Sequence, residues 1–206
     1  GLRTFDTTYF QAPGRMNVFD EHPFKVILDY AHNPAAIKAM VSFVEQLQPT
    51  GNRICVLAAP GDRRDEDILE VARLCAGSFD HYICRRDDNP RGRDEREVPL
   101  MLQDELVAAG VEKETITIEP LEADAVTAAL DMAGVGDLLL IFGDKINRTW
   151  KQIITYSPDL ESEDPAPAQP PATVPTPLVE TSPQLSGDEE IVTDERGVWI
   201  AREEED

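Results

Sequence analysis

The sequence has few cysteines, and their spacing is not typical of a metal or redox site. Only Cys55, Cys75 and Cys84 are present in 206 residues, and none of them forms a CxxC pair. Cys55 and Cys84 lie in apolar segments, and Cys75 lies on the apolar side of an expected helix, so we predict three inert buried thiols. Free thiols of this kind suit a reducing compartment.

Long apolar runs and basic residues are also scarce. The longest purely apolar run in the C-terminal half, Leu138–Phe142, is far shorter than the roughly 20 residues that span a bilayer. Because the first residues form no apolar segment, we expect no secretory signal. Because 40 acidic residues face only 19 basic ones, the net charge is −21, which disfavours nucleic acid and anionic membranes as partners. We expect a cytoplasmic protein with neither partner; its oligomeric state stays open.

The acidic residues are concentrated near the C-terminus. Residues 157–206 hold 14 acidic and 2 basic side chains, a net charge of −12. Residues 157–186 are rich in Pro, Ala, Ser and Thr, so we expect a disordered acidic tail. Within it, residues 190–201 contain two short segments suited to strands around a turn, which fit a marginal hairpin or simple disorder.

Expected strands and helices alternate over residues 15–156. Apolar runs are followed by segments with apolar residues at i, i+3, i+4 and i+7, a spacing that indicates amphipathic helices. This order predicts an α/β domain with a doubly wound, mostly parallel sheet. The expected strands are 15–20, 24–29, 53–59, 81–85, 115–120 and 137–143, and the expected helices are 34–48, 65–76, 98–109, 123–133 and 147–156. Residues 1–14, which open on Gly1 rather than Met, are expected to be a linker from another domain.

Four of the expected strands are followed by polar clusters. The clusters are Asp29–Pro34, Pro60–Asp65, Arg86–Arg93 and Gly143–Arg148. Because parallel strands end at one edge of the sheet, the four clusters are expected to converge there. Arginine suits carboxylates and phosphates, whereas aspartate suits amines, guanidinium groups and ribose hydroxyls. We therefore predict a site for charged small molecules, although each cluster alone also fits a capped helix start, with Asp62 or Asp65 as the cap.

Several catalytic signatures are absent from the chain. It has no GxxxxGK[ST] phosphate loop, GxSxG elbow or HExxH pair, and Gly134-Val135-Gly136 precedes its strand, so it is a turn. His22 and His81 lie at strand edges and are expected to be structural. His32 is the functional candidate, because it precedes a helix N-terminus that favours anions. Lys145 fits a phosphate or carboxylate partner as well as a solvated lysine.

In order along the chain, the motifs resemble the C-terminal domain of the Mur ligase superfamily over about residues 1–156. Pro13–Met16 is similar to the family's interdomain linker, Asp29–Pro34 to its DYAHNP-type motif, Gly61–Arg63 to its GDR loop, and Asp88–Arg91 to the DNPR motif of peptidoglycan ligases. The set PGRMNVFD, LDYAHNPAA, APGDRRDEDI, the RDD–RGR loop and LLLIFGDKINRTWKQI resembles the cyanophycin synthetase family more specifically. The chain departs from the peptidoglycan branch at Gly143–Lys145, where that branch has GKGHE.

The resemblance implies an ATP-dependent ligase that acts in two steps. An acceptor carboxylate takes the γ-phosphate of ATP to give an acyl phosphate, and an amine then displaces phosphate to form an amide. In cyanophycin synthetases, an ATP-grasp module adds aspartate to a polymer and the Mur-like module joins arginine to each aspartate side chain. The implied partners are ATP, arginine, an aspartate-containing acceptor polymer and an ATPase central domain. That domain would hold Mg²⁺ and the triphosphate, so we expect no metal site here and an inactive isolated chain.

The resemblance also suggests roles for individual residues. Asp29 would bind the ATP ribose, and Arg91 would hold the α-carboxylate of the incoming amino acid. Charge complementarity would let Asp87 and Asp88 favour a cationic amino acid such as arginine. The expected site residues are Asp29, His32 and Asn33 for the nucleotide; Asp87, Asp88, Asn89, Arg91 and Arg93 for the amino acid; Asp62 and Arg63 as a supporting loop; and Lys145 as the one catalytic candidate.

Two other functions fit the same sequence. The first is a non-catalytic module that binds a nucleotide or an amino acid and recruits a partner through its acidic tail. The second is a structural domain, in which the polar clusters are helix caps and the tail is a solubilising spacer.

Overall fold

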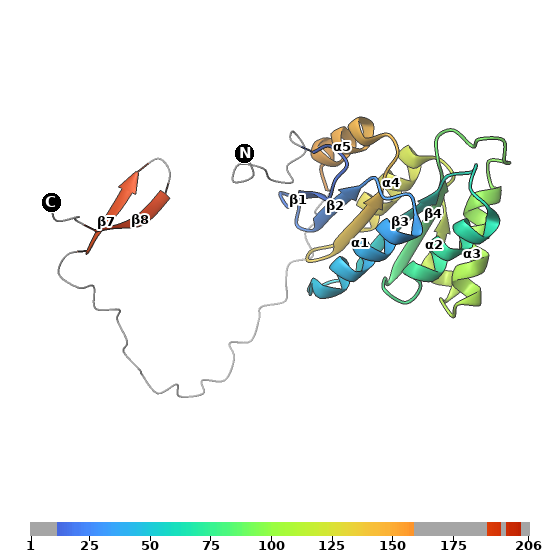
Figure 1. The fold of residues 1–206 in the computed structure, drawn as a ribbon, viewed down its shortest axis with the longest axis horizontal. Coiled ribbons are helices and arrows are strands. Elements are labelled where there is room, and N and C mark those ends of the chain that lie inside the picture. Colours follow the sequence, from blue (N-terminus) through green and yellow to red (C-terminus); the bar gives the residue numbers. More distant parts are fainter. Residues whose placement is uncertain (1–11, 159–188, 195–196, 203–206) are drawn as a thin grey trace, which may run out of the picture. The chain divides into compact units, whose positions relative to one another are not determined.

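The computed structural model describes residues 12–158, 189–194 and 197–202 (Figure 1). The chain divides into two compact units, Gly1–Glu161 and Ser162–Asp206. In the second unit, β7 (Glu189–Asp194) pairs antiparallel with β8 (Gly197–Arg202), in the region where the sequence fits a hairpin. Most of the stretch expected to be disordered, from residue 159 onward, lies outside the described residues.

The first unit contains a six-stranded sheet in the order β1-β2-β6-β3-β4-β5. β1 (Asn17–Phe19) pairs antiparallel with β2 (Lys25–Asp29), and the other neighbours are parallel. The remaining strands are β3 (Arg53–Ala59), β4 (His81–Arg86), β5 (Ile116–Ile118) and β6 (Leu138–Phe142). This arrangement confirms the predicted α/β fold with a mostly parallel sheet. Because β6 inserts between β2 and β3, the strand order reverses there, and ligands bind at such switch points in open sheets.

Helices cover both faces of this sheet (Figure 1). One face carries α1 (Pro34–Gln46), α2 (Asp65–Cys75) and α3 (Glu97–Ala108); the other carries α4 (Glu122–Met132) and α5 (Ile146–Thr155). A short 3₁₀ helix, Lys113–Thr115, precedes β5. In β6, Leu138, Leu140 and Phe142 pack toward the first group of helices, and Leu139 and Ile141 toward the second. Since both faces are covered, the central strands are continuous apolar runs.

The three cysteines are free and buried, as the sequence predicts. Burial raises the pKa of the Cys84 thiol to about 12, so the reactive thiolate does not form at neutral pH. Among the residues that the structure describes, no helix combines the length and apolarity needed to cross a membrane.

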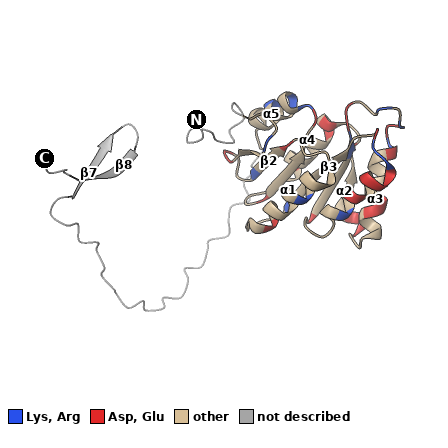
Figure 2. Ribbon diagram, in the orientation of Figure 1, with Lys and Arg blue, Asp and Glu red and all other residues tan. Residues whose placement is uncertain are grey.

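The charged residues are unevenly placed on the first unit (Figure 2). Acidic residues lie along α2 and α3, including Asp65–Asp67, Asp104 and Glu105, whereas the loop after β4 mixes both signs. At the carboxyl ends of the central strands, Gly143 donates its backbone N–H to the carbonyl of Asp29 at 3.0 Å. The loops that follow β2 and β6 therefore meet at one edge of the sheet, where the sequence places polar clusters.

Candidate functional site

Asp29, the last residue of β2, ties the turn before β1 to the motif that follows β2. Its nearly buried carboxylate accepts backbone hydrogen bonds from Ala31 at 2.7 Å and from Met16 at 2.8 Å. The backbone N–H of Tyr30 donates to the carbonyl of Gly14 at 2.8 Å. Both oxygens of the carboxylate thus hold backbone segments in place. Binding of a ribose by Asp29 stays a prediction.

Asn33 and His32 occupy the start of α1. Asn33 is the N-cap, and its side-chain oxygen accepts the backbone N–H of Ala36 at 3.0 Å, while Pro34 fills the first helical position, where its missing N–H costs nothing. The ring nitrogen Nδ1 of His32 lies 3.0 Å from the carbonyl oxygen of Tyr30, and the two rings are 4.9 Å apart. Asn33 therefore has a structural task at this position, whereas His32 also lines a cavity.

The helix start after β3 differs from the simplest expectation. The N-cap of α2 is Arg64, which makes no side-chain cap hydrogen bond. The alternative that Asp62 or Asp65 caps this helix is therefore wrong. Asp65 instead lies inside the first turn, where its carboxylate pairs with Arg93 at 2.6 Å. The acidic first turn still suits the positive end of the helix dipole.

The loops after β3 and β4 are locked together at Gly61. Arg93 donates to the carbonyl oxygens of Gly61 at 2.7 Å and Arg63 at 3.0 Å. A Cβ on Gly61 would lie 2.3 Å from the carbonyl oxygen of Pro90, so only glycine permits this approach. Arg93 holds these loops in place, and its predicted contact with an amino acid stays a prediction.

Asn89 shapes the turn that presents Arg91. The side-chain oxygen of Asn89 accepts the backbone N–H of Arg91 at 3.0 Å, and Arg91 has a left-handed φ of 53°. The Arg91 guanidinium lies 2.9 Å from Asp62 and 3.7 Å from Asp87. Its hydrogen bond lowers the pKa of the exposed Asp62 carboxyl. Burial raises the pKa of Asp87, against the opposing pull of the Arg85 and Arg91 guanidinium groups.

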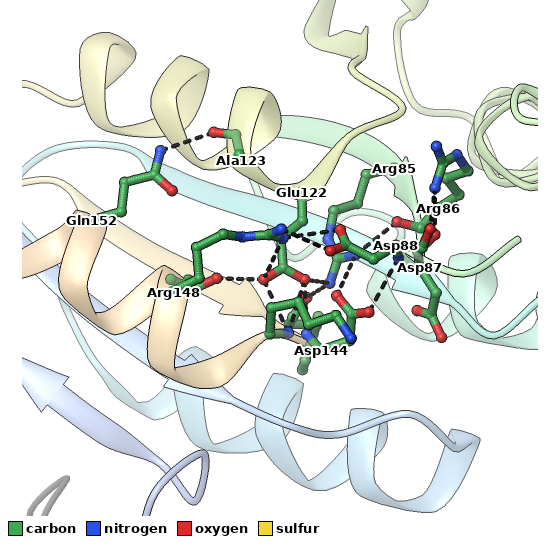
Figure 3. A network of polar contacts seen from close by, with 12 residues as sticks. Arg85, Arg86, Asp87, Asp88, Glu122, Ala123, Asp144, Arg148 and Gln152 are labelled. Atoms are coloured by element: carbon green, nitrogen blue, oxygen red, sulfur yellow. Dashed lines mark hydrogen bonds and ion pairs between the residues drawn. The ribbon is translucent and has the colours of Figure 1, made fainter.

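A buried ion-pair network joins β4, α4 and the turn after β6 (Figure 3). The side chains of Arg85 and Glu122 are 1% and 0% exposed, and Arg85 Nη2 lies 2.9 Å from Glu122 Oε2. The other terminal nitrogen of Arg85 lies 3.3 Å from Asp144 Oδ1. Glu122 also accepts the backbone N–H groups of Asp144 at 2.8 Å and Lys145 at 3.2 Å, and the hydroxyl of Thr149. One carboxylate from α4 therefore organises the whole turn.

Arg148 extends this network to Asp88. Its two terminal nitrogens lie 2.7 and 2.9 Å from the oxygens of Asp88, a bidentate pair that lowers the pKa of Asp88. Arg148 also lies 3.5 Å from Glu122 Oε1. Asp88, Glu122 and Asp144 each offer one oxygen within 4.8 Å of the others, as a metal site would require. Since Arg85 and Arg148 already pair with these oxygens, we assign an ion-pair network here.

Lys145 lies in the turn after β6, but its side chain does not join the ion-pair network. Its backbone N–H is bonded to Glu122, while its side chain is exposed beside an open cavity of about 480 Å³ that Asp144 and Arg148 also line. Within residues 12–158, no ion pair of the Lys145 ammonium group is found. Its catalytic role stays a prediction.

The four strand ends enclose a polar cavity of about 120 Å³. Residues from the loops after β2, β3, β4 and β6 all line it, which places it at the switch point of the sheet. Of the expected site residues, it brings together His32, Arg63, Asp87 and Arg91, and leaves Asp29, Asn33, Asp62, Asp88, Asn89, Arg93 and Lys145 outside its lining. A cavity of about 340 Å³ at the opposite edge is larger, but its lining is mainly apolar. The smaller one has the chemistry of a site for charged ligands.

Sequence reasoning gave no site role to the residues of the buried network. Arg85, Glu122, Asp144 and Arg148 are absent from the expected set, although Asp144 and Arg148 belong to a cluster that it identified. The structure shows why Arg85 belongs to the network: Ile83 packs toward α4 and α5, and residues two apart in a strand share a face. Arg85 must therefore point into the same interior, where a buried guanidinium requires a buried acid.

Comparisons with known proteins identify the family of the chain. The family model described as "Mur ligase, glutamate ligase domain" matches residues 14–145. Cyanophycin synthetase from Geminocystis herdmanii is 37% identical over 158 residues, which cover 76% of this chain and 18% of that protein. The chain thus spans about a fifth of the length of this relative.

Solved structures show the same fold at lower identity. A UDP-N-acetylmuramoyl-L-alanyl-D-glutamate–2,6-diaminopimelate ligase matches with a TM-score of 0.57 and 18% identity, over 70% of this chain and 32% of the other. E. coli FolC in complex with DHPP and ADP matches with a TM-score of 0.53 and 24% identity, over 69% of this chain and 31% of the other. The solved structures show the fold. The family match over residues 14–145 shows that the chain belongs to the Mur ligase family and carries its C-terminal, glutamate ligase domain.

Proposed function

We propose that this chain is the substrate-closing part of an ATP-dependent ligase of the cyanophycin synthetase type, which joins arginine to an aspartate carboxylate. The observation that carries the proposal is the cavity at the switch point, which four separate loops line and which contains side chains of both charge signs. An amino acid is itself charged at both ends, so such a lining can complement it. The relatives named above support a ligase, and the substrates are our inference.

In this proposal the nucleotide lies along the loop after β2. Asp29 and His32 would contact the ribose side, and the α1 N-terminus with its Asn33 cap would face the nucleotide. Because Asp29 already accepts two backbone hydrogen bonds, it would bind a ribose hydroxyl through its remaining lone pairs. Arg63, which lines two cavities together with His32, supplies positive charge there.

The incoming amino acid would occupy the side formed by the loop after β4. Arg91 is half-exposed and borders the cavity, so its guanidinium can pair with an α-carboxylate. Asp87 lines the cavity, whereas Asp88 is neutralised by Arg148. Of the two acids, Asp87 is therefore the one available to a cationic substrate, and Asp88 contributes only if Arg148 moves.

The triphosphate and Mg²⁺ would be bound by a separate ATPase domain. The chain has no phosphate loop, and the one cluster of three acids found among the described residues is paired with two arginines. Bound there, Mg²⁺ would neutralise phosphate charge during formation of the acyl phosphate. We therefore expect the isolated chain to hydrolyse no ATP.

The test is a hybrid enzyme in which this chain replaces the matching 158 residues of the Geminocystis relative. With ATP and an aspartate-containing polymer, we expect phosphate release that depends on added arginine. Aspartate addition by the other module, which the family resemblance implies, reports whether the hybrid is folded. A hybrid that adds aspartate but releases no phosphate with arginine would contradict the proposal, as would ATP hydrolysis by the purified chain alone.

Matched variants locate the amino acid in the same hybrid. Arg91→Ala is expected to raise the KM for arginine at least tenfold, because it removes a charged hydrogen bond of the kind worth about 1.5–3 kcal/mol. Arg96→Ala, an exposed arginine of the same loop, is the control and is expected to change nothing. Asp87→Asn should weaken the binding of arginine more than Asp88→Asn does. The reverse order would show that Asp87 does not contact the amino acid.

The alternative function is a binding module without catalysis. Calorimetry of the isolated chain with ATP and with arginine separates the two ideas. Tight binding of either ligand by the free chain favours the module, whereas absence of binding fits half of a site that is completed by another domain.

A further inference from the structure

The buried network contains one more acid than it has bases. Three carboxyl groups, Asp88, Glu122 and Asp144, come within 4.8 Å of one another, and two guanidinium groups, Arg85 and Arg148, pair with them (Figure 3). A third negative charge in this largely buried place would be costly. One proton shared within the network removes that cost.

The contacts show which acid takes the proton. Asp88 is held as the anion by its bidentate pair with Arg148. Glu122 accepts two backbone N–H groups and the Thr149 hydroxyl and lies 2.9 Å from Arg85. These donors stabilise its ionised form and outweigh the opposite effect of its burial. Asp144 has fewer and more distant donors: Arg85 at 3.3 Å and one backbone N–H, from Asp88, at 3.1 Å. Burial, and then its hydrogen bond with Glu122, raise the pKa of Asp144 to about 7.

Asp144 is also the member of the carboxyl pair that reaches the cavity. Its side chain is 18% exposed, whereas that of Glu122 is fully buried. It lines the 120 Å³ cavity together with Asp87, His32 and Arg91. A ligand held by Arg91 and Asp87 would thus lie in the same small space as the Asp144 carboxyl group.

We propose that Asp144 accepts the proton from the incoming amine in the amide-forming step, and that Glu122 is the positioning residue that tunes it. The inference rests on the proposed function. An amino acid arrives as an ammonium ion, which has no free electron pair for attack. The Asp144 carboxylate takes one ammonium proton, and the nitrogen forms a bond to the acyl carbon. The bond from that carbon to phosphate breaks, inorganic phosphate leaves with the electron pair, and the second nitrogen proton passes to solvent.

Charged and titratable groups lie around Asp144 on several elements. They are Arg85 and Asp88 from the end of β4, Glu122 from α4, Lys145 and Arg148 from its own turn and α5, and Tyr30, His32, Arg63, Asp87 and Arg91 across the cavity. A proton acceptor works best when it titrates near the working pH. The network places Asp144 there by surrounding it with a neighbouring acid and partial burial.

The first test uses the 206-residue chain itself. The ¹³C shift of the Asp144 carboxyl carbon, followed by NMR against pH, is expected to titrate near neutral pH in the wild type. In Glu122→Gln the neighbouring negative charge is gone, so the midpoint of Asp144 should move to lower pH. Titration of Asp144 in the ordinary range of aspartates in the wild type overturns the proposal.

The second test uses the hybrid ligase with two different amines. Asp144→Asn is expected to lower kcat for arginine at least 100-fold, since general base catalysis supplies about 10²–10⁴-fold. Hydroxylamine needs no base, because it is largely unprotonated at neutral pH, so Asp144→Asn should form hydroxamate at the wild-type rate. Equal losses with both amines would mean that Asp144 is only structural. Asp104→Asn, an exposed aspartate on α3, is the control.

The pH profile provides a readout that a purely structural role would not change. Glu122→Gln should move the rising limb of kcat with arginine to lower pH; a uniform loss at all pH values would contradict tuning by Glu122. If that variant fails to fold, the hydroxylamine comparison on Asp144→Asn still decides the proposal. Absence of hydroxamate from the wild-type hybrid would instead mean that the proposed ligase function itself is wrong.

Discussion

The two halves of the candidate site differ in how their charged side chains are paired and exposed. In the buried half, defined by Arg85, Glu122 and Asp144, charges pair with each other and with backbone groups, and the exposed Arg148 borders it. The side chains of Arg85 and Glu122 are inaccessible to water. In the open half, defined by His32, Arg63, Asp87 and Arg91, side chains border a cavity, and the ion pair of Arg91 with Asp62 is exposed. The buried half holds the loops in place, and the open half leaves its side chains lining a cavity.

Removing the central acid of the buried half is expected to have the largest effect. Glu122→Ala leaves Arg85 buried without its closest acid, and breaking a buried pair in this way costs about 3–5 kcal/mol. Urea unfolding of the full chain measures the loss. Glu114→Ala, at an exposed position, should change the free energy of unfolding by no more than about 0.5 kcal/mol; similar losses in both variants would show that the network adds little.

The next largest effect is expected where the loops after β3 and β4 touch. Gly61→Ala places a methyl group 2.3 Å from a backbone oxygen that cannot rotate away, so we expect a loss of about 1–3 kcal/mol. Gly134→Ala is the control, because its nearest contact is 3.7 Å away. Thermal unfolding that ranks the two variants equally would mean that the loops separate at little cost.

A smaller loss is expected at the start of α1. Asn33→Ala removes the N-cap hydrogen bond to Ala36, which typically costs about 1 kcal/mol. Asn33→Asp keeps an acceptor oxygen and should retain stability by the same urea assay. If both substitutions are neutral but the hybrid ligase loses affinity for ATP, Asn33 acts on the nucleotide rather than on the helix.

The smallest effect on stability is expected in the open half. Asp62→Ala breaks an exposed pair with Arg91, and such pairs contribute little because water and salt screen them. The midpoint of thermal unfolding should not change measurably, at low or high salt. A clear loss of stability would show that the open half is also a structural network, and the contrast between the halves would fail.

The sequence predicted the elements of the fold better than the contacts of the site. Strand and helix periods are local, so the alternation over residues 15–156 was visible, with ends displaced by a few residues: the strand expected at 115–120 is Ile116–Ile118. The meeting of four polar clusters at one edge followed from parallel strands alone. The sequence did not show that Arg93 binds loop carbonyls or that Asp88 is already paired, because both depend on partners from other loops.

By itself, the sequence determined the α/β class, the burial of the three cysteines and the edge at which charged residues gather. Each of these follows from the pattern of apolar and polar residues along the chain, which is visible over short stretches of sequence. Only the tertiary structure decided that β6 lies between β2 and β3, that Asp87 rather than Asp88 lines the cavity, and that Glu122 joins Arg85 to Asp144. The physical reason is that a buried charge must be matched by another, and its match comes from a segment that no local period can reveal.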